Sequence, residues 1–211
     1  MAVQSNQWFQ FMQEIVVATG NQGKLKEINQ VLNPFGLLAL GQKQLNVPDI
    51  EETGLTFVEN AILKARNAAS LTGKPALADD SGLEVDALQG APGIYSARYA
   101  GTDATDAANV NKLLGALQNI PREQRTARFQ CVMVYLRHAA DPVPLICQGT
   151  WEGYIDFQPS GDNGFGYDPV FVVPQHNCTA AQLKPEVKNQ LSHRGQALQK
   201  LMQAFSRKQN G

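Results

Sequence analysis

The stretch Pro75-Ala76-Leu77-Ala78-Asp79-Asp80-Ser81-Gly82 places two adjacent carboxylates directly after a short apolar run. The apolar residues predict a buried strand, and Gly82 lets the chain turn sharply, so we expect the strand to end at the acidic pair. On a strand that continued, the two aspartates would point to opposite faces. Buried acidic side chains are costly unless something positive binds them. Such a pair favours either a hard divalent cation with a phosphate or a solvated turn.

Helices and strands alternate along the rest of the chain. Thr56, with Glu59 three residues later, predicts a helix start, and Asp141-Pro142 predicts the turn of an antiparallel hairpin. The pattern indicates an α/β protein with a mixed sheet. Hydrophobic spacing predicts strands over 15–18, 127–137, 144–151 and 171–173, and helices over 24–32, 57–70, 104–118 and 189–206.

Size and composition exclude several classes of protein. The 211 residues suit a single domain or two small lobes, and the net charge of −1 is too small to hold a nucleic acid polymer. No apolar run is long enough to span a membrane, and three widely spaced cysteines match neither a disulfide framework nor a zinc site. Residues 1–14 lack the features of a signal peptide, so we expect a loosely ordered extension before a domain over 15–211, in a cytoplasmic protein.

Several polar segments at the ends of apolar elements carry candidate chemistry. The turn Thr19 to Lys24 leads from a strand into a helix, which suits phosphate binding but is also an ordinary turn. The pair Glu51-Glu52 precedes a helix, where it serves either a metal or the helix dipole. The loop Gly164 to Pro169 alternates glycines with aromatic residues, which suits either stacking on a flat base or a tight turn. Lys188 and Ser192-His193-Arg194 add cations, or form a solvated helix face.

Taken together, these segments give the chain a resemblance to the Ham1-like family of inosine/xanthosine triphosphate pyrophosphatases, in particular its bacterial branch. The resemblance extends from Ile15 to the last helix, and six motifs in order make it specific. The motifs are Ala18–Lys24, Glu52–Ala61, Ala78–Leu83, Gly90–Gly101, Gly164–Pro169 and Ser192–Arg194.

The resemblance implies a fold, an activity and a cofactor. Family members have an elongated mixed sheet flanked by helices, with two lobes around a central cleft, and are generally homodimers. They hydrolyse ITP, dITP and XTP between the α and β phosphates, giving a monophosphate and pyrophosphate. The reaction requires Mg²⁺, for which Mn²⁺ is a possible substitute. It cleanses the nucleotide pool of hypoxanthine and xanthine.

The resemblance also implies roles for particular residues. Asp80 is expected to accept the proton of the attacking water, and Lys24 to offset charge that shifts during displacement. Phe165 is expected to stack on the base, while His193, Arg194 and backbone N–H groups donate to its 6-oxo group. The expected metal ligands are Asp80, Glu52, Glu51 and Asp79. The expected substrate-binding residues are Thr19, Gly20, Asn21, Gln22, Gly23, Lys24, Ser81, Phe165, Gly166, Tyr167, Asp168, Lys188, His193 and Arg194.

Three other interpretations remain at this stage. A pyrophosphatase of the Maf type would share the fold and act on modified pyrimidine or 7-methylguanosine triphosphates, although the Ser192-His193-Arg194 segment favours the purine enzymes. A non-catalytic nucleotide sensor would be expected to lack a metal carboxylate or Lys24, and both are present. In a structural or interaction protein, the motifs would be coincidental.

Overall fold

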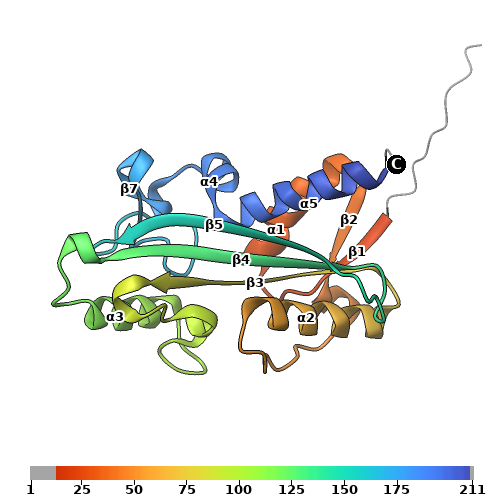
Figure 1. Cartoon of the computed structure of the whole chain (residues 1–211), viewed down its shortest axis with the longest axis horizontal. Helices are drawn as coiled ribbons and strands as arrows, with labels where there is room; N and C mark the ends of the chain where they lie inside the picture. Colours follow the sequence, from red (N-terminus) through yellow and green to blue (C-terminus); the bar gives the residue numbers. More distant parts are fainter. Residues whose placement is uncertain (1–12, 210–211) are drawn as a thin grey trace, which may run out of the picture.

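The computed structural model of the chain describes residues 13–209 (Figure 1). Of the predicted extension over 1–14, residues 1–12 lie outside the described part. Gln13 and Glu14 already belong to the first strand, so the predicted boundary is wrong by two residues. Glu14 forms an ion pair with Lys74 at 2.6 Å. Within residues 13–209, no helix is long and apolar enough to cross a membrane.

One mixed sheet of seven strands, in the order β2-β1-β3-β4-β5-β6-β7, runs through the whole molecule and confirms the predicted α/β class. β1 pairs in parallel with β2 and β3, and all later pairs are antiparallel, including the predicted β4–β5 hairpin. The strands are β1 (Gln13–Val17), β2 (Leu37–Gly41), β3 (Ala76–Val85), β4 (Thr126–Leu136), β5 (Leu145–Ile155), β6 (Phe171–Val173) and β7 (Cys178–Thr179).

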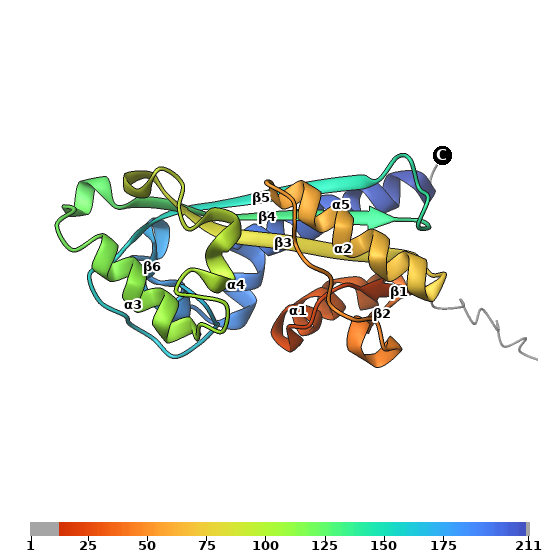
Figure 2. The same cartoon turned by 90° about the horizontal axis from the view of Figure 1, so that it is seen from below.

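Helices cover both faces of this sheet (Figures 1 and 2). α1, α4 and α5 lie on one face, and α2 and α3 lie on the other. A short 3-10 helix, η4 (Gly93–Arg98), packs beside β3. The helices are α1 (Gln22–Leu32), α2 (Phe57–Thr72), α3 (Asp106–Ala116), α4 (Pro185–Leu191) and α5 (His193–Gln209).

The two faces of the central strands separate two hydrophobic cores by strict alternation. Leu77 packs in the core beneath α1 and α5, whereas Ala76 and Ala78 pack in the core beneath α2. α2 contributes small residues to that core, among them Ala61 and Ala65, so helix and strand approach closely. A third core around Phe171 fills the other end of the molecule, near α3, β6 and α4.

The prediction that β3 ends at the acidic pair is wrong. β3 continues to Val85, because β4 pairs with all ten of its residues. Gly82 is not a turn: a Cβ at this position would lie 2.3 Å from the carbonyl oxygen of Gly93, so glycine is needed for close packing against η4. The acidic pair therefore lies in mid-strand, with its side chains on opposite faces.

The predicted last helix over 189–206 is two helices. α4 ends at Leu191, Ser192 adopts an extended conformation, and α5 begins at His193. The Ser192 hydroxyl accepts a hydrogen bond from the backbone N of Gly195 at 3.1 Å, as a helix N-cap does. β2, over residues 37–41, is an edge strand to which the sequence analysis assigned no element.

Candidate active site

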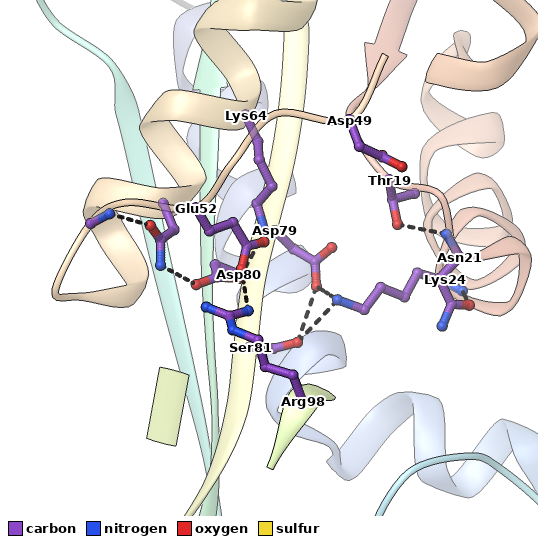
Figure 3. Close-up of polar contacts among 12 residues, drawn as sticks. Thr19, Asn21, Lys24, Asp49, Glu52, Lys64, Asp79, Asp80, Ser81 and Arg98 are labelled. Atoms are coloured by element: carbon purple, nitrogen blue, oxygen red, sulfur yellow. Dashed lines mark hydrogen bonds and ion pairs between the residues drawn. The ribbon is translucent and has the colours of Figure 1, made fainter. Parts of the chain in front are cut away.

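Asp79 lies on the α1 and α5 side of β3, in a group of buried charges (Figure 3). Its Oδ2 accepts hydrogen bonds from Lys24 Nζ at 3.0 Å and from two guanidinium nitrogens of Arg194 at 3.3 Å. Burial favours the neutral acid, but Lys24 and Arg194 outweigh it and hold the pKa of Asp79 far below its usual value. Its Oδ1 is buried and has no hydrogen-bond partner among the described residues. Asp79 is therefore an ionised counter-charge for two cations.

Asp80 lies on the α2 side, in a second charged group. Its Oδ1 accepts a 2.7 Å bond from Lys64 Nζ, and Asn60 donates to its Oδ2 at 3.4 Å. Lys64 also bonds Glu52 at 3.0 Å, and Arg98 bonds the other oxygen of Glu52 at 3.2 Å. Burial raises the pKa of Asp80 despite the opposing effect of Lys64. This raised pKa makes the Asp80 carboxylate a stronger proton acceptor.

Of the four predicted metal ligands, Glu52 and Asp80 are the pair that could hold a divalent cation together, because both bond the same Lys64 ammonium. Within residues 13–209, no group of three or more His, Cys, Asp or Glu side chains is arranged to hold a metal. Glu51 is exposed, and Asp79 is bound to Lys24 on the other side of β3. The Lys64 ammonium already bridges Glu52 and Asp80, so the gap accepts positive charge. Mg²⁺ commonly takes one or two carboxylates and completes its shell with substrate phosphates.

The turn before α1 is a capped helix start. Thr19 Oγ accepts a bond from Asn21 N at 3.1 Å, and Asn21 Oδ1 caps α1 by accepting from Lys24 N at 3.1 Å. A Cβ on Gly23 would lie 4.0 Å from the Phe165 ring, so this turn faces the loop over residues 164–169, the aromatic loop. Backbone N–H groups and the helix dipole at such a turn favour phosphate.

The aromatic loop is held from within by Asp168. Its Oδ2 accepts from Phe165 N at 2.8 Å and from Lys188 Nζ at 2.6 Å, and Lys188 also lies 4.9 Å from the centre of the Phe165 ring. Tyr167 is buried and donates its hydroxyl to the carbonyl oxygen of Ser96 at 2.8 Å. Tyr167 therefore anchors the loop, while Phe165 is the aromatic surface that is available to a base.

The alternative of a solvated His193-Arg194 face is excluded, because both side chains are buried. The His193 ring stacks on Phe129, with centroids 4.8 Å apart, and its Nδ1 has no partner among the described residues. Burial and the neighbouring cations hold the pKa of His193 well below its usual value, so the imidazole is neutral at pH 7. Arg194 is largely occupied by Asp79 and by Glu27, which its Nη1 bonds at 2.9 Å. His193 is thus the freer of the two to meet a ligand.

Two cavities meet between these groups. They share Asn21, Lys24 and Ala97 in their linings. The first is lined by ten of the predicted residues: Asn21, Lys24, Ser81, Phe165, Gly166, Tyr167, Asp168, Lys188, His193 and Arg194. The second is lined by six: Thr19, Gly20, Asn21, Lys24, Glu52 and Asp79.

A few predicted residues lie outside both linings, and other residues were missed. Gln22, Gly23 and Glu51 line neither cavity, and Asp80 is linked to the second through its bond to Lys64. Asn60 and Lys64 could have been found, because residues four apart share a face of the predicted helix. The residues that the sequence analysis missed are Glu27, Asp49, Asn60, Lys64, Ser96, Arg98, Asp106 and Phe129.

A mixed sheet that carries a cavity of lysines and carboxylates next to an aromatic cavity is typical of a nucleotide-binding protein. The chain belongs to the Ham1 family, whose profile matches residues 15–204. It is 60% identical over 194 residues to a dITP/XTP pyrophosphatase of Vibrio cholerae, covering 92% of this chain and 97% of the relative. A relative of the same name from Escherichia coli O157:H7 is also 60% identical over 194 residues, covering 92% and 98%.

Solved structures agree with this assignment. A HAM1 protein from Coxiella burnetii superposes with a TM-score of 0.87 at 53% identity, covering 93% of this chain and all of that one (100%). A nucleoside-triphosphatase / dITP/XTP pyrophosphatase from Mycobacterium abscessus gives a TM-score of 0.71 at 42% identity, covering 90% and 97%. The predicted family and fold are therefore confirmed, and the Maf-type interpretation is not favoured.

Proposed function

We propose that this protein hydrolyses deaminated purine nucleoside triphosphates, namely dITP, ITP and XTP, to the monophosphate and pyrophosphate. The observation that carries the proposal is the pair of adjoining cavities, which share Asn21 and Lys24. One is lined by both lysines and carboxylates, which suits a triphosphate bound with a divalent cation, and the other holds an aromatic ring and a buried neutral imidazole suited to a base. The names of the relatives support the substrate class.

The proposed reaction breaks the bond between the α and β phosphates and adds the elements of water across it. Asp80 accepts the proton of the water, which its raised pKa favours. Lys24 and the N-terminus of α1 hold the triphosphate and stabilise the charge that develops on its oxygens. Glu52 and Asp80 would hold Mg²⁺ or Mn²⁺, which neutralises phosphate charge and orients the leaving group when bound. Lys64, which bonds both carboxylates and lines this cavity, adds positive charge beside the phosphates.

Base selection in this proposal depends on donors to a 6-oxo group. Hypoxanthine and xanthine accept a hydrogen bond at this position, whereas adenine presents an amino donor. A neutral His193 has one N–H to donate. In the Phe165–Asp168 loop, the backbone N–H groups of Phe165, Gly166 and Asp168 already donate within the protein, so Tyr167 N is the backbone group that could add a donor. A donor facing the adenine amino group is left unpaired, and such a mismatch can reject a substrate strongly.

Location and assembly complete the proposal. Cys131, Cys147 and Cys178 are free thiols, which suits a reducing cytoplasm and supports a role in cleansing the nucleotide pool.

We also infer a homodimer from the family resemblance. Leu55 and Tyr95, exposed beside one surface groove, supply apolar area for it. Analytical ultracentrifugation would measure the assembly, and a sedimenting mass of one chain at micromolar concentration would contradict it.

Product analysis tests the reaction itself. With dITP and Mg²⁺, we expect dIMP and pyrophosphate in equal amounts, and no dIDP. An Asp80→Asn variant should lose about a hundredfold or more in kcat while still binding the substrate. Release of inorganic phosphate with dIDP would contradict the assigned bond, and full activity of the variant would contradict the role of Asp80.

A further inference from the structure

Asp106, the first residue of α3, is used neither by the predicted site nor by the proposed reaction. Its Oδ2 accepts a hydrogen bond from the backbone N of Gly166 at 2.7 Å. Asp106 is exposed, and it lines both the aromatic cavity and a groove between α3 and the segment 159–169. Among residues 13–209, this is the only hydrogen bond that joins α3 to that segment.

The loop that Asp106 contacts has little intrinsic stiffness at its tip. Gly164 and Gly166 both have positive φ, at 81° and 61°, in the left-handed region that glycine adopts at no steric cost. Asp168 and Tyr167 hold the base of the loop, through bonds to Phe165 N and to Ser96 O. At the tip, Gly166 N is fixed from outside by Asp106 alone.

We propose that Asp106 is a positioning residue for the purine base. By holding Gly166, it keeps the Phe165 ring oriented for stacking before the substrate arrives, which lowers the entropy lost on binding. A carboxylate is a stronger acceptor for this purpose than a neutral group. The inference rests on the proposed function, because Phe165 is taken to be the surface that meets the base. Asp106 touches no phosphate-binding group, so it acts on base binding and not on bond cleavage.

The test compares Asp106→Ala with Asp106→Asn, and uses Asp103→Ala as the control. Asp103 is a nearby exposed aspartate with no side-chain hydrogen bond in the described structure. The readouts are KM and kcat for dITP and the dissociation constants of IMP and of inorganic pyrophosphate. IMP carries the base together with one phosphate, whereas pyrophosphate carries no base, so an effect confined to IMP reports base binding.

We expect Asp106→Ala to raise KM for dITP and the dissociation constant of IMP by about tenfold, equivalent to about 1.4 kcal/mol. The kcat and the pyrophosphate constant should stay within about twofold of the wild type. Asp106→Asn should restore most of the IMP binding, because its amide oxygen can still accept from Gly166 N, although less strongly than a carboxylate does. The control should bind both ligands as the wild type does.

Three results would overturn the inference: unchanged IMP binding in Asp106→Ala, equal weakening of IMP and pyrophosphate, or an Asn variant as weak as the Ala variant. The last two would indicate general damage to the cleft or a charge effect. A wild-type protein that binds IMP without turning over dITP would contradict the proposed function instead, and the IMP constants would still decide the role of Asp106.

Discussion

Replacing Asp79 by Asn tests the charge balance on which the candidate site depends. The side chain of Asp79 is 1% exposed and that of Arg194 is 3%, whereas Lys24 is 18% exposed and can be partly hydrated. Asn keeps the shape of the side chain and removes the negative charge, so Lys24 loses its carboxylate partner and Arg194 keeps only its ion pair with Glu27. Removing one partner of a buried ion pair costs about 3–5 kcal/mol.

We expect the lower end of that range, about 3 kcal/mol, because Lys24 keeps some contact with water. For a chain of this size, the melting temperature should fall by about 6–12 °C. Pyrophosphate should restore more stability to the variant than to the wild type, since the anion supplies the missing charge. Asp86→Asn is the matched control, because Asp86 pairs with Arg128 at the surface, where such pairs contribute about 1 kcal/mol or less.

The effect of Asp79→Asn should also depend on pH. The pKa of Asp79 is lower in the folded protein than in the unfolded chain, so its contribution is present above about pH 4 and is lost as the pH falls through the folded value. The difference between wild type and variant should therefore shrink in acid. Thermal denaturation at neutral pH, with and without pyrophosphate, is the assay. A variant that melts with the wild type, or that gains no more from pyrophosphate, would refute the reasoning.

Other substitutions test the positions of the base-reading groups. A Cβ on Gly149 would lie 2.0 Å from the carbonyl oxygen of His193, so Gly149→Ala must push the start of α5 outward. Because a misplacement of about 1 Å can cost about a hundredfold in rate, kcat/KM for dITP should fall steeply in this variant. Gly115→Ala is the control, because the space around Gly115 is open and the substitution should leave activity unchanged. Equal activity of the two variants would show that the position of the start of α5 does not affect catalysis. The pKa of His193 is lower in the folded protein than in the unfolded chain, so the free energy of unfolding should decline by up to about 1.4 kcal/mol per pH unit as the pH drops below about 6.5. Urea denaturation of His193→Gln should lack this dependence on pH. A slope that persists in that variant would assign it to other groups. Lys188→Met should weaken the hold on Asp168 and raise KM for dITP about tenfold with a smaller change in kcat, and steady-state kinetics showing KM unchanged would exclude that role.

Much of this architecture is predictable because local patterns agree with the fold. Thr56 caps α2 through a bond from Glu59 N, as the capping signal indicates, and the β4–β5 hairpin forms where the apolar runs predict it. The predicted turn at Gly82 is wrong because a glycine has the same appearance in the sequence whether it permits a turn or a close approach. Only the position of Gly93, eleven places along the chain, distinguishes the two.

The site was predictable in its residue types and not in its pairings. The motifs identified Asp79, Asp80 and Lys24, but the sequence does not show that a continuing strand sends the two aspartates to different helices. Glu27 and Asp106 were missed because they act through tertiary contacts, with Arg194 and with Gly166. The burial of His193 depends on its close approach to Gly149 on β5 and on the Phe129 ring, which a helical pattern alone does not indicate.

The most direct test of the central claim is the ratio of kcat/KM for dITP to that for dATP, measured with Mg²⁺ by pyrophosphate release from purified protein. The two substrates carry the same sugar and triphosphate, so the ratio isolates the reading of the 6-position of the base. The proposed donors in the cleft predict a preference for dITP of about a hundredfold or more. Equal values for the two nucleotides would contradict the account.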